Sequence, residues 1–139
     1  MAQPENVFIG SVHKHLPAAL YKIKNNNLYN GGQADCWYSG AKADLWIEYK
    51  FIAIPKRDDT VIDLIHGTAK KDSDISTLQQ SWLKGRHAEG RNVGVLIGSK
   101  EGGVWMPGVS WDTVLSTKVF RSLLLSRPQV AQVICALTV

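Results

Sequence analysis

The sequence predicts an α/β domain in which helices flank a central mixed β-sheet. The chain has 139 residues, a length that suits one domain with its own core. Hydrophobic residues make up 45% of it and charged residues 20%, which excludes wholesale disorder and a disulfide scaffold. Segments with helical and with strand periodicity alternate along the chain. No apolar run approaches the ~20 residues that span a bilayer. We therefore expect one soluble, cytoplasmic domain over residues 1–139.

The N-terminal half contains one predicted helix and two predicted strands. Residues 5–16 form the helix, because their apolar side chains fall on one stripe and Pro17 ends it. That stripe consists of Phe8, Ile9, Val12 and Leu16. Residues 33–52 form two strands joined by a turn at residues 39–42, which is a hairpin pattern. Residues 54–71 are polar and charged, and we expect a long loop there.

A second helix and two further strands are predicted next. Residues 73–87 carry Ile75, Leu78 and Trp82 at helical spacing. Residues 93–98 are almost continuously apolar, which is typical of a strand covered on both faces. Residues 104–106 form another short strand. The core of the domain is therefore expected to span about residues 5–106.

The C-terminal part is predicted to be helical. Beyond Pro107, apolar residues recur at helical spacing over residues 114–124. Residues 130–137 continue this pattern after Pro128, a residue often found at a helix start. We expect a helical extension over about residues 110–139, whose apolar side chains either fill the core or contact a second copy of the chain.

The second strand of the hairpin has two unlike faces, because successive side chains of a strand alternate. One face is apolar and carries Leu45, Ile47, Tyr49 and Phe51. The other carries Trp46, Glu48 and Lys50, so the last two project side by side. Asp44 has the same parity as Glu48 but lies ~13 Å away along the strand. We interpret Asp44 as a turn residue exposed to solvent.

The hairpin brings a second carboxylate to this charged face. A turn centred on residues 41–42 places Asp35 opposite Glu48 and Trp37 opposite Trp46. Directly opposite residues have Cβ atoms ~5 Å apart, a distance at which two carboxylates repel each other unless a cation lies between them. Mg²⁺ takes oxygen ligands from one or two carboxylates and keeps several waters. The spacing therefore predicts a magnesium site.

Two polar residues occupy positions on predicted apolar stripes. Glu5 falls in the middle of the first helix's stripe. Its carboxylate either joins a metal or basic site, or is an acidic residue that the helix dipole favours after Pro4. Gln79 lies on the stripe of the second helix, where it either serves the site or forms a capping box with Ser76.

Asp35, together with the later Glu48-Tyr49-Lys50, resembles the D-x(n)-E-x-K signature of the PD-(D/E)XK nuclease superfamily. The residue before the aspartate, proline in the usual motif, is Ala34 here. Four other features extend the resemblance to short phage-encoded and VRR-NUC-type members: the Gly31-Gly32 approach to Asp35, the apolar run through the ExK strand, the upstream Glu5, and Gln79-x-x-Trp82 before the strand at 93–98.

The resemblance implies a restriction-endonuclease-like fold and a Mg²⁺-dependent DNA endonuclease of bacteriophage type, in which Mn²⁺ can replace Mg²⁺. By the same resemblance, Asp35, Glu48 and the main-chain carbonyl of Tyr49 hold the metal ion. Lys50 orients or deprotonates the attacking water and offsets charge on the phosphate.

The resemblance also gives roles to the two polar residues on the apolar stripes. Glu5 completes the site through a metal-bound water or a second metal. Gln79 positions Lys50 or the scissile phosphate.

Basic residues gather near the second helix, and the net charge of the chain is +4. They either contact DNA phosphates or are solvated cations at a helix end; they are Lys70, Lys71, Lys84, Arg86, His87 and Arg91. The loop at 54–71 is long enough to reach DNA at the site. Trp37 and Trp46 either stack on unpaired bases or pack on the sheet.

The expected partner is DNA, whether duplex, branched or nicked. A homodimer is expected for duplex cleavage, because one small site cuts one strand. The alternative function is a catalytically silent nucleic-acid-binding module, but Asp35, Glu48 and Lys50 are all present and favour the enzyme.

Overall fold

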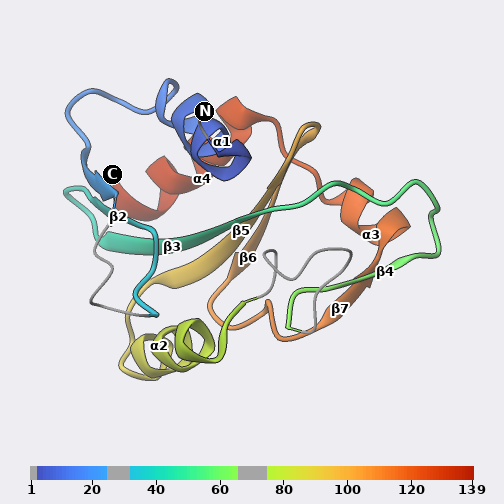
Figure 1. Ribbon diagram of the computed structural model, residues 1–139. Coiled ribbons are helices and arrows are strands. Elements are labelled where there is room, and N and C mark those ends of the chain that lie inside the picture. The colour runs from blue at the N-terminus through green and yellow to red at the C-terminus, as the bar shows by residue number, and fades with distance from the viewer. Residues whose placement is uncertain (1–2, 25–31, 66–74) are drawn as a thin grey trace.

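The computed structural model describes residues 3–24, 32–65 and 75–139. Figure 1 shows a central twisted sheet with helices on both sides. In chain order, the elements are α1 (Pro4–His13), β1 (Tyr21–Lys24), β2 (Cys36–Ser39), β3 (Asp44–Phe51), β4 (Val61–Asp63), α2 (Thr77–Ala88), β5 (Val93–Ser99), β6 (Gly102–Pro107), β7 (Val114–Ser116), α3 (Thr117–Ser122) and α4 (Arg127–Thr138).

The main sheet is mixed, as the sequence predicted. It has five strands in the order β1-β2-β3-β5-β6, and a separate two-stranded sheet joins β4 to β7. Strands β3 and β5 run parallel, whereas the other neighbours in the main sheet are antiparallel. Trp37 lies opposite Trp46 in the β2–β3 pair, which confirms the register predicted from the turn.

The two faces of β3 are buried by different layers. Helices α1 and α4 cover the face that carries Leu45, Ile47 and Tyr49 (Figure 1). Helix α2, the β4–β7 sheet and α3 cover the opposite face, where Leu83 of α2 and Trp46 join a second core cluster. The predicted alternation along this strand is therefore confirmed, and Glu48 and Lys50 point to the side of α2.

One segment predicted to be helical is a strand. Residues 114–116 form β7, because their backbone pairs with β4, with Val61 opposite Ser116. The helix begins only at Thr117, since the Ser116 hydroxyl caps it by accepting a hydrogen bond from the Val119 N–H. The same pairing places β4 within residues 54–71, which the sequence predicted to be loop; residues 66–71 of that segment lie outside the described residues.

Strand β1 was not predicted, although Tyr21 and Ile23 alternate with two lysines; the pattern covers only four residues, of which three have exposed side chains. It pairs with β2 at the edge of the sheet, with Tyr21 opposite Ser39. Helix α1 ends at His13, earlier than the predicted boundary, although Leu16 is still buried against the core.

The C-terminal helix α4 begins where it was predicted, after a Ser126 cap and with Pro128 in its first turn. Its side chains Val130, Ala131 and Ile134 are buried in the core cluster shared with α1. The apolar stripe of α4 therefore fills the core of one chain. Among the described residues, no helix is both long enough and apolar enough to cross a membrane.

Candidate active site

The hairpin brings the two predicted carboxylates together. Asp35 immediately precedes β2, and its Oδ2 accepts a hydrogen bond of 2.9 Å from the backbone N–H of Tyr49 in β3. This bond fixes the Asp35 side chain beside the strand that carries Glu48. Glu48 is only 1% exposed, and burial and the nearby charge of Asp35 are among the causes that raise its pKa. The predicted pairing of Asp35 with Glu48 thus has a direct structural basis.

One oxygen of Glu48 has two partners and the other has none. Glu48 Oε2 lies 3.5 Å from Lys50 Nζ and accepts a hydrogen bond of 2.8 Å from Gln79 Nε2. Glu48 Oε1 is buried and has no hydrogen-bond donor among the described residues. When both acids are charged, Asp35 offers no proton to this oxygen. A shared proton or a bound cation is needed to satisfy it.

Burial shifts the ionisation of these acids. Burial and the nearby Asp35 charge raise the pKa of Glu48 well above its ordinary value, although Lys50 opposes the shift. Burial also raises the pKa of Asp35, against the hydrogen bond from Tyr49. Desolvation by burial, helped by Asp35, raises the pKa of Glu5 to about 7. Three acids therefore interact electrostatically at one place, and burial raises the pKa of each, against the opposing charge of Lys50.

Gln79 fulfils both alternatives that the sequence left open. Its backbone N–H and side chain form the capping box with Ser76 that starts α2. Its side-chain Nε2 also donates to Glu48, as described above. The cap holds the Gln79 side chain near the N-terminus of α2, where it reaches the site. Gln79 therefore contacts Glu48 in the structure, and its expected role toward Lys50 or the scissile phosphate stays a prediction.

The donor set suits a hard divalent cation. In the described ranges, no three His, Cys, Asp or Glu side chains are arranged to hold a metal ion together. Mg²⁺ does not require such a cage, because one or two carboxylates, waters and substrate phosphates commonly suffice. Asp35 and Glu48 offer two carboxylates, and the free Glu48 Oε1 needs a positive partner. These residues fit the ion, whereas ligation by Glu5 and by the Tyr49 carbonyl stays a prediction.

The predicted basic residues separate into four groups. Arg86 and Arg91 line an open pocket next to the site, and Arg86 also pairs with Glu89. Lys84 instead lies 3.9 Å from Asp112 and over the ring of Trp111.

His87 is exposed in the last turn of α2, where the helix dipole favours a cation. Lys70 and Lys71 lie outside the described residues.

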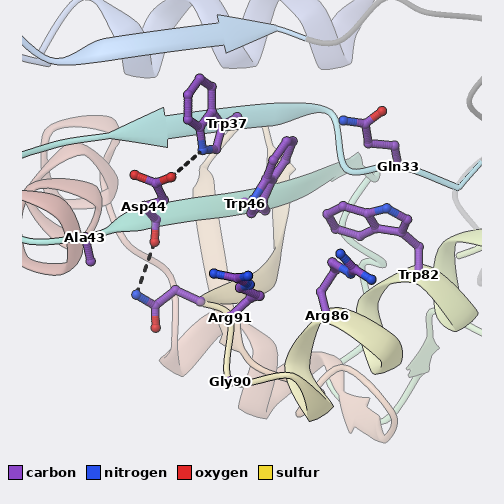
Figure 2. Close-up of a pocket in the computed structure, with 10 residues that line it drawn as sticks. Gln33, Trp37, Ala43, Asp44, Trp46, Trp82, Arg86, Gly90 and Arg91 are labelled. Carbon is purple, nitrogen blue, oxygen red and sulfur yellow. Dashed lines mark hydrogen bonds between the residues drawn. The ribbon is translucent and has the colours of Figure 1, made fainter.

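Figure 2 shows the pocket, which has a volume of about 700 Å³. Trp37 on β2, Trp46 on β3 and Trp82 on α2 form aromatic walls. Trp37 and Trp46 stack on each other with ring centroids 5.8 Å apart, which confirms that they pack on the sheet. Stacking on unpaired bases stays a prediction. Trp82 was not predicted from the sequence to line a pocket. Its spacing of three residues from Gln79 on one helix face was the available signal.

Asp44, the other acid with the parity of Glu48, is exposed to solvent and lies apart from Asp35 and Glu48, as predicted. Its oxygens accept hydrogen bonds from Trp37 Nε1 at 3.1 Å and from the Ser39 hydroxyl at 2.7 Å. It therefore closes the hairpin and orients Trp37.

Comparison with known proteins identifies a shared fold. No protein-family model matches the chain, and no curated protein matches it in sequence. Among solved structures, it is similar to Hjc, a Holliday junction resolvase from the archaeal hyperthermophile Archaeoglobus fulgidus. The similarity has a TM-score of 0.52 at 15% sequence identity and covers 92% of each chain. Together with the mixed sheet and the paired Asp35 and Glu48, this similarity shows that the chain has the restriction-endonuclease-like fold of the PD-(D/E)XK nucleases.

Proposed function

We propose that this protein is a Mg²⁺-dependent endonuclease that hydrolyses phosphodiester bonds in DNA. The observation that carries the proposal is the buried Glu48 carboxylate, which faces Asp35 and Lys50 and has one oxygen without a donor among residues 3–24, 32–65 and 75–139. A structural ion pair would satisfy both oxygens, because unpaired buried acceptors lower stability. The shared fold with a resolvase supports a nuclease, and the side chains at the site have the chemistry that hydrolysis needs.

Each residue has a role in this proposal. Asp35 and Glu48 would hold the ion, with the Tyr49 carbonyl as a further ligand and Glu5 acting through water or a second ion. When bound, Mg²⁺ supplies a water of lowered pKa and positive charge for the phosphate oxygens. Lys50, held 3.5 Å from Glu48, orients that water and offsets charge on the phosphate. Gln79 keeps Glu48 aimed by its hydrogen bond.

The proposed substrate is branched DNA, and the proposed assembly is a homodimer. The solved structure that shares the fold is described as a Holliday junction resolvase. A single site cuts one strand, so symmetric cleavage of two strands requires two copies of the chain. Size measurement by light scattering, with and without a four-way junction, checks the second copy.

The direct test is incubation with supercoiled, linear, four-way-junction and single-stranded DNA, in Mg²⁺ and in EDTA. We expect at least one substrate to be cut in Mg²⁺ alone. Lys50→Ala should lower the rate roughly 100-fold or more, because it removes a transition-state contact. DNA binding in EDTA should survive the substitution.

Lys118→Ala is the matched control, because Lys118 is an exposed lysine on α3 outside the site. Wild-type cleavage that Lys50→Ala leaves unchanged would reject the assignment of the site. Binding without any cleavage would instead identify a catalytically silent nucleic-acid-binding module.

A further inference from the structure

The pocket of Figure 2 continues directly from the proposed active site, because three elements each contribute to both. Asp35 and Trp37 are two residues apart around the start of β2. Trp46 precedes Glu48 by two residues on the same face of β3, a separation of ~7 Å. Gln79 and Trp82 share one face of α2. Each of the three tryptophans is therefore displaced from its neighbour in the site in the same direction, by about two strand residues or ~7 Å on β2 and β3.

The walls of the pocket are aromatic surfaces that are still accessible. Trp37, Trp46 and Trp82 are all half-buried, so none is fully enclosed in the core. Trp82 meets Trp46 at 71° with ring centroids 5.4 Å apart. Two rings at this angle form a corner rather than a closed stack, and a flat ligand ring can lie against one wall.

Guanidinium groups stand at the same pocket. Arg86 of α2 and Arg91 of the loop after it both line it (Figure 2). Arg91 is exposed and has no ion-pair partner in the part of the chain that the structure describes. The acid that lines the pocket, Asp44, already accepts hydrogen bonds from Trp37 and Ser39. The pocket therefore combines aromatic faces with two guanidinium groups, of which Arg86 also pairs with Glu89.

A nucleotide has the complementary chemistry, since it joins a flat base to a phosphate. The volume of about 700 Å³ lies within the roughly 300–1,000 Å³ range of small-molecule sites. A paired base must first be unpaired and unstacked before it can enter a side pocket, whereas an unpaired base enters at a lower cost.

We propose that the pocket walled by Trp37, Trp46 and Trp82 binds one unpaired base of the DNA strand next to the cleaved phosphate. Arg86 and Arg91 hold the phosphates that flank this base. This inference rests on the proposed nuclease function and gives it a substrate class. That class is DNA with an unpaired nucleotide at the cleavage position, such as a bulge, a branch point that carries unpaired nucleotides, or a single strand.

Binding in EDTA tests the pocket without requiring cleavage. Two labelled duplexes are compared by fluorescence anisotropy, one with a single bulged thymidine and one with an abasic residue at that position. The abasic duplex keeps the same phosphates and lacks only the base. We expect the wild type to bind the thymidine bulge roughly 5- to 150-fold more tightly, the range that base–aromatic stacking gives.

Variants assign this preference to the pocket. Trp82→Ala should remove most of it, whereas Trp82→Phe should keep part because it retains an aromatic face. Trp105→Phe is the matched control, since Trp105 is a half-buried tryptophan packed against the core on the α1–α4 side of the sheet. Loss of the preference in the control as well, or its persistence in Trp82→Ala, would overturn the inference.

A measurement on the wild type alone covers the case in which Trp82→Ala does not fold. A duplex with 2-aminopurine at the bulge should lose fluorescence on binding, because the base stacks on tryptophan. Unchanged fluorescence together with equal affinity for both bulges would overturn the inference. Continued Mg²⁺-dependent, Lys50-dependent cleavage in that case would leave the proposed function standing. Base preference without cleavage of any DNA would support the pocket and reject the nuclease.

Discussion

Strand β3 buries polar groups on both faces, and the two clusters differ in how well they are satisfied. On the α1–α4 side, the Tyr49 and Tyr38 hydroxyls lie 2.7 Å apart, and Tyr38 lies 2.8 Å from His13 Nε2. On the α2 side, Glu48 has one oxygen bound to Lys50 and Gln79 and one that finds no donor in the described part of the chain. The central groups of the two clusters, Tyr38 with Tyr49 and Glu48, are equally buried, with exposed fractions of 0%, 0% and 1%.

This difference separates a structural polar cluster from one built to bind. The two tyrosines are fully buried, and their neutral hydroxyls satisfy each other, so burial raises the pKa of both and keeps them uncharged. Among the described residues, the acidic cluster has no such complete set of hydrogen-bond partners, since Glu48 Oε1 lacks a donor. A fold that retains an unsatisfied buried carboxylate sacrifices stability at that point, as functional sites commonly do.

The largest expected effect comes from Glu48→Gln, which removes the charge and keeps the shape. Cleavage in Mg²⁺ should fall roughly 100-fold or more, because one of two carboxylates for the ion is lost. Stability at pH 8 should fall by less than about 3–5 kcal/mol, the loss typical of a broken buried ion pair, because the loss of the Lys50 partner is offset by removal of a buried carboxylate that repels Asp35. Cleavage rates and thermal unfolding of the same preparation measure both effects.

Glu101→Gln is the control for this substitution, since Glu101 is an exposed acid that pairs with Arg121. Its cleavage rate should match the wild type. A marked loss of stability in Glu48→Gln would show that Glu48 serves the fold and would remove the contrast between the two clusters.

The next effect is stabilisation by Mg²⁺. An ion that binds the folded state alone, at 100 times its Kd, adds about 2.7 kcal/mol to the free energy of unfolding. We expect the Tm of the wild type to rise with Mg²⁺ concentration at constant ionic strength, and the Tm of Glu48→Gln to respond much less. An equal response of the two proteins would place the bound ion elsewhere.

Tyr38→Phe is expected to have a smaller effect, which lowers stability and leaves cleavage unchanged. This change leaves the Tyr49 hydroxyl and the His13 ring without their shared partner. Unfolding should therefore cost about 1–3 kcal/mol less, the penalty of unsatisfied buried polar groups. Cleavage by the folded fraction should be unchanged. Urea denaturation measures the stability, and a cleavage assay below the unfolding transition measures the activity. A lower cleavage rate in fully folded Tyr38→Phe would show that the tyrosine cluster also affects the acidic site.

The sequence predicted the charged cluster better than the aromatic one, for a physical reason. Alternation in β3 and a tight turn determine register, and register alone places Asp35 beside Glu48. The link from Tyr38 to His13 depends on where α1 packs over the sheet, which no local pattern specifies. The double role of Gln79 follows likewise from the docking of α2.

The short strands show the same limit. Strand β7 has three residues and pairs with β4, far away in sequence, so its backbone gains partners that periodicity cannot reveal. Its apolar residues continue a helical stripe by coincidence, and tertiary pairing outweighs that pattern. The fold core and the acid pair were predictable from local signals, whereas the second sheet and the third tryptophan of the pocket required the structure.

Finally, α1 carries one residue of each cluster, and the two should respond oppositely to pH. Burial raises the pKa of Glu5 from 4.5 to about 7, so its contribution to stability is complete below pH 4.5 and is lost as pH rises through about 7. Burial, with Lys22 and Lys24, lowers the pKa of His13 from 6.5 to about 4. Its contribution is complete above pH 6.5 and is lost as pH falls through about 4.

The smallest expected effects are therefore changes of slope in metal-free protein. Between pH 4.5 and 7, Glu5→Gln should remove part of the stability loss that the wild type shows on the alkaline side. Between pH 6.5 and 4, His13→Gln should remove part of the loss on the acid side. Urea midpoints every half pH unit in EDTA give both slopes. Because Mg²⁺ favours charged acids, its addition should flatten the alkaline slope and leave the acid slope unchanged; an ion effect on the His13 slope would mean that the two faces of the sheet are coupled.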